Sequence, residues 1–235
     1  MTIGYNPRIV SDGLVLCLDA ANTRSYNEAS SPTVWKDLSG YENNGTLRNS
    51  PTYTSSNSGS IVFDGINDDV NCGNDDSINF GTGDFTVSIW FKRYTNATTN
   101  LRLLSKAADS DTADSTHAGF AFFGSDSALS FSVNPTAART TISAGNYSLN
   151  TWVNVVGVLE RGASMRAYQN CIQTGYSAAA LSGSVSGSTS LFLGSSFGTG
   201  IYWAGEISNV CMYNKALSVA EIQQNFVALR GRFDL

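Results

Sequence analysis

The chain has 235 residues, with 14 Lys and Arg, 19 Asp and Glu and one His, which gives a formal net charge of −5. This acidic balance excludes broad binding to a nucleic-acid backbone, which needs a clustered basic surface. The single His117 argues against a multi-histidine metal centre and a His-dependent triad. Hydrophobic residues make up 42% and charged residues 14%, a composition that indicates a folded domain rather than a disordered chain.

The first residues do not have the sequence pattern of a targeting signal. Residues 1–10 lack the basic and apolar regions of a secretory signal peptide, and no apolar run approaches the length of a membrane span. We therefore expect synthesis in a cytoplasm, no membrane partner, and a short N-terminal arm over residues 1–9.

Short runs rich in β-branched and aromatic residues recur along the chain, separated by Gly, Asn, Ser and Asp. Their spacing predicts an all-β fold of two antiparallel sheets. Residues 85–93 alternate apolar and polar side chains, whereas residues 152–160 are apolar on both faces, which predicts a central, doubly covered strand. The predicted strands are 14–19, 60–63, 69–72, 85–93, 102–106, 119–123, 128–133, 152–160, 164–170, 190–194 and 202–213.

One short helix is predicted near the C-terminus. Ser218 and Glu221 have the spacing of a capping box, and an apolar stripe follows at Ile222, Phe226 and Leu229. Gly231 stands where a C-terminal cap is expected. We therefore expect one domain over residues 10–229 and a separate tail over 230–235.

The four cysteines favour buried free thiols over disulfides. Cys17 and Cys211 lie in apolar runs, and no Cys-x-x-Cys spacing suits zinc or redox chemistry.

Several segments resemble a known family. They are 13–22 (GLVLCLDAAN), 34–47 (VWKDLSGYENNGTL), 61–70 (IVFDGINDDV), 85–91 (FTVSIWF), 152–156 (WVNVV) and 205–218 (GEISNVCMYNKALS), with Glu221-Ile222 after them. In order and content they are similar to the concanavalin A-like lectin/glucanase family, in its laminin G-like branch. The resemblance covers nearly the whole chain and implies a two-sheet antiparallel jelly-roll sandwich with one short C-terminal helix.

The chain departs from the family at one hairpin. Members usually have Tyr-x-Asn-Gly there, whereas this chain reads Tyr168-Gln169-Asn170-Cys171. Because glycine supplies the positive φ of such a turn, we expect a turn of different type or length.

Catalysis is not expected. Glucanases of this fold usually place Glu-x-Asp-x-x-Glu on one strand, and none of the five glutamates begins such a run; they are Glu28, Glu42, Glu160, Glu206 and Glu221. His117 lies in a polar segment without a nucleophile pattern around it. We expect a protein that is not an enzyme and requires no cofactor.

A structural calcium ion is one alternative. The resemblance implies that an acidic residue near the Phe-Asp-Gly motif and another near the penultimate strand share the ion; here these are Asp64 and Glu206, with Asn209 nearby. The other interpretation is that Asp64-Gly65 and Asn67-Asp68 form turns, because Asp and Asn bond their own backbone there.

Aromatic residues offer candidates for sugar contact, namely Trp90, Tyr94, Tyr202 and Trp203. The competing interpretation is that they belong to the core, as the resemblance implies for Trp35 and Trp152.

The opening segments are also similar to stand-alone proteins of tailed phages, especially cyanophages. We therefore expect a non-enzymatic phage virion structural protein (capsid decoration, neck or tail/fibre component), located in the virion. It would contact other virion proteins, form a homo-oligomer and bind no nucleic acid. The expected docking arms carry Tyr5, Pro7, Arg232 and Phe233. The alternative is a carbohydrate-binding adhesin that recognises host surface glycans.

Overall fold

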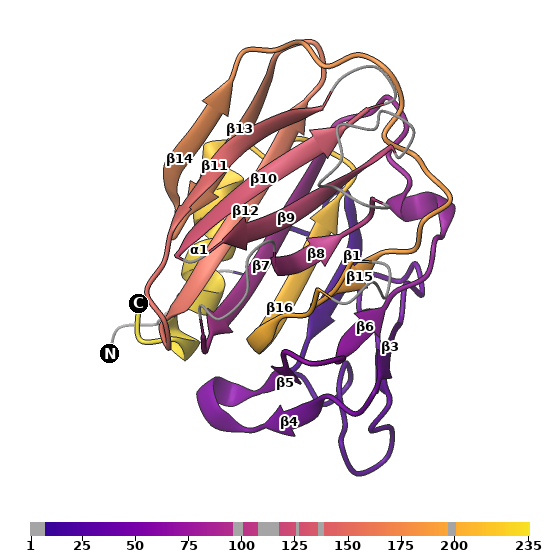
Figure 1. Ribbon diagram of the computed structural model, residues 1–235, viewed down its shortest axis with the longest axis vertical. Coiled ribbons are helices and arrows are strands. Elements are labelled where there is room, and N and C mark those ends of the chain that lie inside the picture. The colour runs from indigo at the N-terminus through magenta and orange to yellow at the C-terminus, as the bar shows by residue number, and fades with distance from the viewer. Residues whose placement is uncertain (1–7, 96–100, 108–117, 126, 136–138, 197–200) are drawn as a thin grey trace.

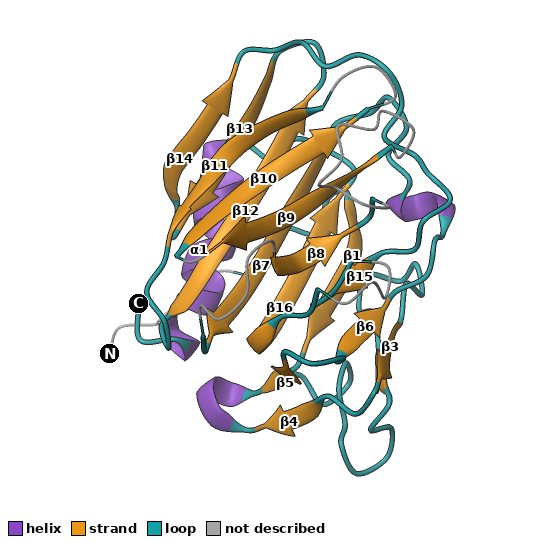
Figure 2. Cartoon of the chain, viewed as in Figure 1, coloured by secondary structure: helices purple, strands orange, loops and turns teal. Residues whose placement is uncertain are grey.

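The computed structural model describes residues 8–95, 101–107, 118–125, 127–135, 139–196 and 201–235. Two antiparallel sheets pack face to face, which confirms the predicted all-β sandwich (Figures 1 and 2). The first sheet contains, in spatial order, β14 (Ile172–Ser177), β13 (Ser164–Gln169), β12 (Trp152–Glu160), β7 (Phe85–Arg93), β16 (Ala204–Tyr213), β5 (Ser60–Asp64) and β4 (Thr52–Thr54), with β1 (Leu14–Asp19) paired to β16.

The second sheet contains, in spatial order, β11 (Thr140–Asn146), β10 (Ala128–Asn134), β9 (Gly119–Ser125), β8 (Leu101–Ser105), β15 (Phe192–Leu193), β6 (Asp69–Asn71), β3 (Gly45–Arg48) and β2 (Val34–Trp35). Three short 3₁₀ turns complete the secondary structure, namely η1 (Ser56–Ser58), η2 (Asp76–Ile78) and η3 (Arg230–Arg232).

The core between the sheets is aromatic. Phe85 of β7 faces Phe120 of β9, with ring centroids 4.8 Å apart, and Phe122 packs on Phe131 at 4.9 Å. Strand β12 lies between β7 and β13 and is buried on both faces, as its sequence predicts. Its Gly157 is required by this packing, because an added Cβ would lie 2.7 Å from the Phe131 ring.

Helix α1 (Val219–Leu229) covers the outer face of the first sheet (Figure 2). The capping box is present as predicted: the Ser218 side chain accepts a hydrogen bond from the Glu221 backbone, and the Glu221 side chain accepts one from the Ser218 backbone. Ile222, Phe226 and Leu229 are all buried, so the predicted apolar stripe is the face that packs on the sheet.

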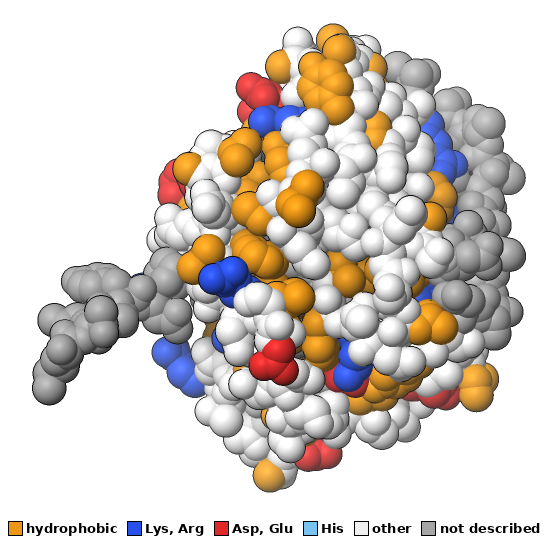
Figure 3. Space-filling view, turned by 90° about the vertical axis from the view of Figure 1, so that its left-hand side faces the viewer, with side chains coloured by type: hydrophobic (Ala, Val, Ile, Leu, Met, Phe, Trp, Pro, Cys, Tyr) orange, Lys and Arg blue, Asp and Glu red, His pale blue; other side chains and the backbone are white. Residues whose placement is uncertain are grey.

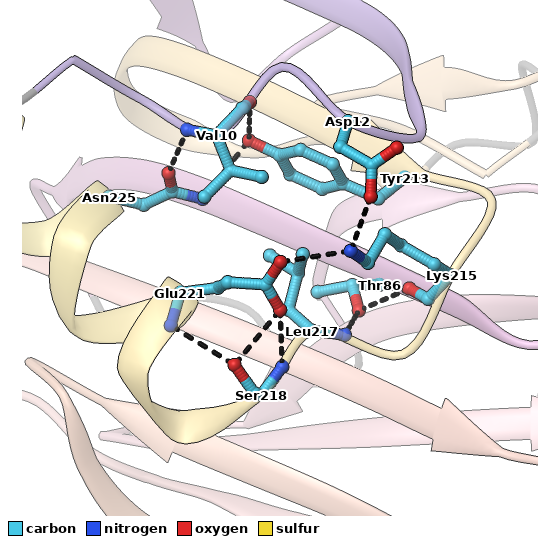
Figure 4. A network of polar contacts seen from close by, with 9 residues as sticks. All are labelled: Val10, Asp12, Thr86, Tyr213, Lys215, Leu217, Ser218, Glu221 and Asn225. Atoms are coloured by element: carbon cyan, nitrogen blue, oxygen red, sulfur yellow. Dashed lines mark hydrogen bonds and ion pairs between the residues drawn. The ribbon is translucent and has the colours of Figure 1, made fainter.

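A polar network fastens the start of the domain to this helix (Figure 4). The Val10 backbone donates to Asn225 Oδ1 at 2.7 Å, and the Tyr213 hydroxyl donates to the Val10 carbonyl at 3.2 Å. Lys215 Nζ lies 2.6 Å from Asp12 and 2.9 Å from Glu221. Segments about 200 positions apart are thus joined, and the described N-terminal segment belongs to the domain from Arg8 onward.

Two expectations about the C-terminus are wrong. Gly231 does not form a left-handed cap, because the helix ends with Arg230 in right-handed helical geometry and continues into η3. Residues 230–235 are not a separate tail either. Arg232 forms a bidentate ion pair with Asp19, at 2.7 and 2.9 Å, and Phe233 is buried against the first sheet.

The expectation of an altered turn between β13 and β14 is also wrong. Asn170 and Cys171 have φ values of 48° and 68°, and two consecutive left-handed residues between strands are the signature of a type I′ hairpin. Asn154 stabilises the turn, since its backbone N–H donates to Asn170 Oδ1 and its carbonyl accepts from the Asn170 backbone, both at 2.9 Å. The Cys171 side chain packs against the outer apolar layer.

The predicted free thiols are confirmed for Cys17, Cys72 and Cys211, which are buried and not disulfide-bonded. Burial raises the pKa of the Cys72 thiol far above its ordinary value. Within the described ranges, no helix is long and apolar enough to cross a membrane.

Candidate functional site

Two of the predicted sugar-contacting aromatics are closed to solvent. Trp90 is 1% exposed and lies between Phe226 and Phe233, with ring centroids 5.5 and 4.3 Å away. Trp203 is 0% exposed and meets Phe91 edge-on in the core. Neither ring presents a face to a ligand. Alternation along β7 does point Trp90 away from the central core, but α1 and η3 cover that side.

The other two aromatic candidates keep part of their surface open. Tyr94 is 39% exposed, and its hydroxyl donates to Glu206. Partial burial, followed by this hydrogen bond to a carboxylate, raises the pKa of Tyr94. Tyr202 is half-buried and pairs with Ser195 in an isolated β-bridge.

The residues of the predicted calcium site have separate roles. Asp64 Oδ1 accepts backbone hydrogen bonds from Ile66 and Asn67, at 2.7 and 3.2 Å, which is the turn interpretation. Glu206 is buried and binds Lys92 Nζ at 2.7 Å and the Ser60 hydroxyl at 2.5 Å. Asn209 donates to the Leu18 carbonyl. Among the described residues, no group of three His, Cys, Asp or Glu side chains could hold a metal ion.

The predicted docking residues divide into two sets. Tyr5 and Pro7, like His117, lie outside the described residues. Arg232 and Phe233 are held within their own chain by Asp19 and Trp90, so neither extends as an arm.

Two adjoining clefts open between the loops that follow β1 and β2. The first has a volume of about 310 Å³ and is lined by Thr23, Arg24, Ser25, Asn27, Ser30, Ser31 and Lys36. The second has a volume of about 450 Å³ and is lined by Asn22, Arg24, Lys36, Asp37, Leu38, Gly40, Glu42 and Asn44. Because they share Arg24 and Lys36, we treat the two as one site, the Arg24–Lys36 cleft. The loop over residues 20–33 leaves the lower end of β1 in Figure 1.

Backbone pairing positions the two cations. The Lys36 backbone donates to the Ser25 carbonyl at 2.7 Å, and the Ser25 hydroxyl donates back to the Lys36 carbonyl at 2.6 Å. Trp35 beside it is 0% exposed, and since side chains alternate along an extended chain, the neighbouring Lys36 faces outward. Arg24 directly precedes Ser25. Both cationic side chains therefore extend from two backbone segments that these two hydrogen bonds join.

Asp37 fixes the other wall of the cleft. Its carboxylate accepts hydrogen bonds from the backbones of Cys17, Ser39 and Asn43, at 2.8, 2.9 and 3.1 Å, and from the Ser39 hydroxyl at 2.6 Å. Asn44 Oδ1 accepts from the Asp37 backbone at 2.9 Å. The segment Trp-Lys-Asp-Leu-Ser-Gly therefore builds a rigid rim. Tyr41, within this loop, is 51% exposed.

The cleft carries two exposed cations that have no carboxylate partner among the described residues. Arg24 and Lys36 are exposed, and in the described part of the chain neither side chain makes an ion pair or hydrogen bond. By contrast, Arg48, Arg166 and Arg232 are each paired with a carboxylate. The first cleft is lined by these two cations and five neutral polar residues, with no carboxylate.

The sequence did not reveal this site. Arg24 and Lys36 are isolated cations in polar loops, and nothing in their spacing shows that Ser25 pairs with Lys36. The one available signal was length: residues 20–33 form a 14-residue connection between β1 and β2 without secondary structure, and such loops are commonly functional.

Comparisons with known proteins agree with the fold. The family model of the concanavalin A-like lectin/glucanases superfamily matches residues 63–223, and no curated protein matches the sequence. The chain is similar to the binding domain of Paraclostridial Mosquitocidal Protein 1, with a TM-score of 0.74 and 16% identity over 92% of this chain and 52% of that one.

Two further solved structures are similar. The botulinum neurotoxin serotype D ligand binding domain, in complex with N-acetylneuraminic acid, has a TM-score of 0.70 and 13% identity over 93% of this chain and 51% of that one. Trypanosoma rangeli sialidase, in complex with the inhibitor DANA, has a TM-score of 0.67 and 14% identity over 95% and 35%. The chain thus spans about half or less of the structures it matches. Because the family model covers well over half of its length, the chain belongs to the concanavalin A-like lectin/glucanase superfamily.

Proposed function

We propose that this protein binds carbohydrate, without cleaving it, through the Arg24–Lys36 cleft. The observation that carries this proposal is the lining: five of the seven residues of the first cleft have hydroxyl or amide side chains, and Leu38 is the sole larger apolar contributor in either cleft. Small-molecule sites are usually lined by apolar groups, so this cleft suits a ligand covered in hydroxyls. Ser and Thr hydroxyls and Asn amides can each both donate and accept, as sugar recognition requires.

Size and rigidity support the same ligand class. Both volumes fall within the range of about 300–1,000 Å³ typical of small-molecule sites. The hydrogen bonds of Asp37 and Ser25 hold the walls before any ligand arrives, which reduces the ordering cost of binding. Tyr41, which is exposed, stands in the sequence between the lining residues Gly40 and Glu42.

The similar structures support the proposal at the level of the scaffold. The serotype D domain and the trypanosomal sialidase were each solved with a sialic acid or an inhibitor bound. Fold alone does not transfer a ligand, because function resides in sites added to a scaffold. The residues that line the Arg24–Lys36 cleft lie before residue 63, where the family match begins, so the match assigns no ligand to them.

A glycan array followed by calorimetry on the best-binding sugar tests the proposal. Ser30→Trp places a bulky ring in the first cleft, and Ser182→Trp makes the same change at an exposed serine outside the cleft. We expect saturable binding by the wild type and by Ser182→Trp, and loss of binding in Ser30→Trp. If the wild type binds no glycan, or if both variants bind equally, the proposal is wrong.

A second candidate function is the structural role in a phage virion that the sequence predicts. It draws support from β14, the outermost strand of the first sheet, where Ile172 is 71% and Tyr176 58% exposed. Figure 3 views the side of the molecule that carries this strand and shows apolar side chains set in a largely uncharged surface. An open strand edge with apolar side chains favours pairing with another copy. Light scattering of wild type and Ile172→Asp tests this: we expect an oligomer that dissociates in the variant, and a monomeric wild type would contradict it.

A further inference from the structure

We propose that the ligand of the Arg24–Lys36 cleft is an acidic glycan, and that Arg24 and Lys36 together bind a sugar carboxylate. This inference rests on the proposed function and adds the chemical class of the sugar. The starting point is charge: a protein with a net charge of −5 lines its first cleft with two cations and no carboxylate.

Single exposed cations are common on protein surfaces, but here two cations line the same cleft. Arg24 and Lys36 both line both clefts. Two hydrogen bonds between Ser25 and Lys36, one between their backbones at 2.7 Å and one from the Ser25 hydroxyl to the Lys36 carbonyl at 2.6 Å, fix the positions from which they extend. Two cations that line one cleft repel each other. An anion between them relieves that repulsion, so the pair is complementary to a single acidic group.

No nearby carboxylate among the described residues forms an ion pair with either cation. Asp37 lines the second cleft but already accepts four hydrogen bonds from the 17–43 region. Glu42 also lines the second cleft, and Glu28 lies in the loop over residues 20–33. Within the described residues, neither makes an ion pair with Arg24 or Lys36.

The two side chains offer complementary chemistry to a carboxylate. Arginine presents a planar fork that matches both carboxylate oxygens, whereas lysine supplies a compact charge with rotatable donors. The surrounding Ser, Thr and Asn side chains would then bind ring hydroxyls. Two cations are too few for a nucleic-acid backbone, which is bound by many phosphate contacts, so the anion is expected to be part of a sugar.

Matched sugars test the inference by calorimetry. The probes are an oligouronate and a sialylated oligosaccharide, the carboxyl-reduced form of each, and a sulfated oligosaccharide of similar length. Because hydrogen bonds to charged groups are stronger than neutral ones, we expect the better carboxylated probe to bind about tenfold or more tightly than its reduced form. We also expect this preference to weaken with added salt.

Arg24→Gln and Lys36→Gln should each reduce the ratio of the affinity for the carboxylated sugar to the affinity for its reduced form. Arg230→Gln, which removes an exposed arginine outside the cleft, should leave it unchanged. Equal affinity for acidic and reduced sugars would overturn this inference and leave carbohydrate binding standing. Preference for the sulfated probe over both carboxylated ones would overturn the carboxylate assignment. Absence of binding to every sugar would overturn both proposals.

Discussion

The outer face of the first sheet and the Arg24–Lys36 cleft contrast in how they use their residues. The outer face is rich in aromatic rings, with Trp90 and Trp152 both packed on Phe233, and it is sealed by α1 and η3. The cleft is lined by hydroxyls and amides, by the cations Arg24 and Lys36 and by the carboxylates Asp37 and Glu42, and it is open. In this molecule the outward-facing aromatic residues therefore form a second buried layer, between the first sheet and the C-terminal helix. The accessible site is formed instead by polar loops, which hydrogen bonds between side chains and backbone groups hold in place.

The contrast has a physical origin. Apolar rings on an outward-facing strand gain free energy when they are covered, and the chain supplies that cover from its own C-terminus. The cleft loops have no such driving force. Their order comes from Asp37, Ser25 and Asn27, whose side chains satisfy backbone N–H and C=O groups.

The largest expected effect comes from opening the sealed face. Phe233→Ala removes a ring that is 4% exposed and stacks on Trp90 at 4.3 Å. We expect a loss of about 3–5 kcal/mol in the free energy of unfolding, measured by urea denaturation, with sugar affinity retained. Leu235→Ala, at a residue that is 44% exposed, is the control and should change little. Unchanged stability in Phe233→Ala would show that the C-terminus does not seal this face.

A smaller effect is expected from loosening the cleft. Asp37→Ala removes the acceptor of four hydrogen bonds and leaves the N–H of Asn43, a residue that is 3% exposed, without its partner. We expect a loss of about 1–3 kcal/mol in unfolding free energy together with weaker sugar binding. Asp37→Asn, which keeps one acceptor oxygen, should lose less of both. Full sugar affinity in a destabilised Asp37→Ala protein would show that the rim does not preorganise the site.

The smallest effect concerns the helix cap that holds the sealed face. The hydrogen bond from Lys215, followed by that from the Ser218 backbone, lowers the pKa of Glu221. A carboxylate with a depressed folded pKa stabilises the fold above its unfolded pKa of about 4.3, and this contribution is lost as pH falls through the folded value.

Glu221→Gln should therefore be less stable than the wild type at pH 7, by under about 1 kcal/mol because the pair is partly exposed. The difference should disappear at low pH in thermal melts. A difference that grows on acidification would contradict the assigned role of the ion pair.

The sequence predicted the elements whose signals are local. Alternation identified β7 and β12, and the Ser218–Glu221 spacing identified the start of α1. Strands β11 and β14 were missed because edge strands need only one apolar face, and Ile172–Ser177 shows almost none. The very short β2 and β4 carry too few residues for a periodic signal.

The candidate site was less predictable because it depends on contacts between distant residues. Periodicity showed that Trp90 faces outward but not that Phe233, 143 positions later, covers it. Cys171 was expected to alter its turn, but packing against the outer layer and the Asn154 clamp hold the left-handed conformation. Arg24 and Lys36 are brought into one cleft by the hydrogen bonds between Ser25 and Lys36, and no local sequence pattern predicts those bonds.

The most direct test of the account is a crystal structure of the protein with the tightest-binding oligosaccharide from the array. The account predicts a sugar within hydrogen-bond distance of the Arg24 and Lys36 side chains, with Phe233 still stacked on Trp90. A sugar bound instead over Tyr94 or Tyr202, or on a Trp90 ring uncovered by a displaced C-terminus, would contradict it.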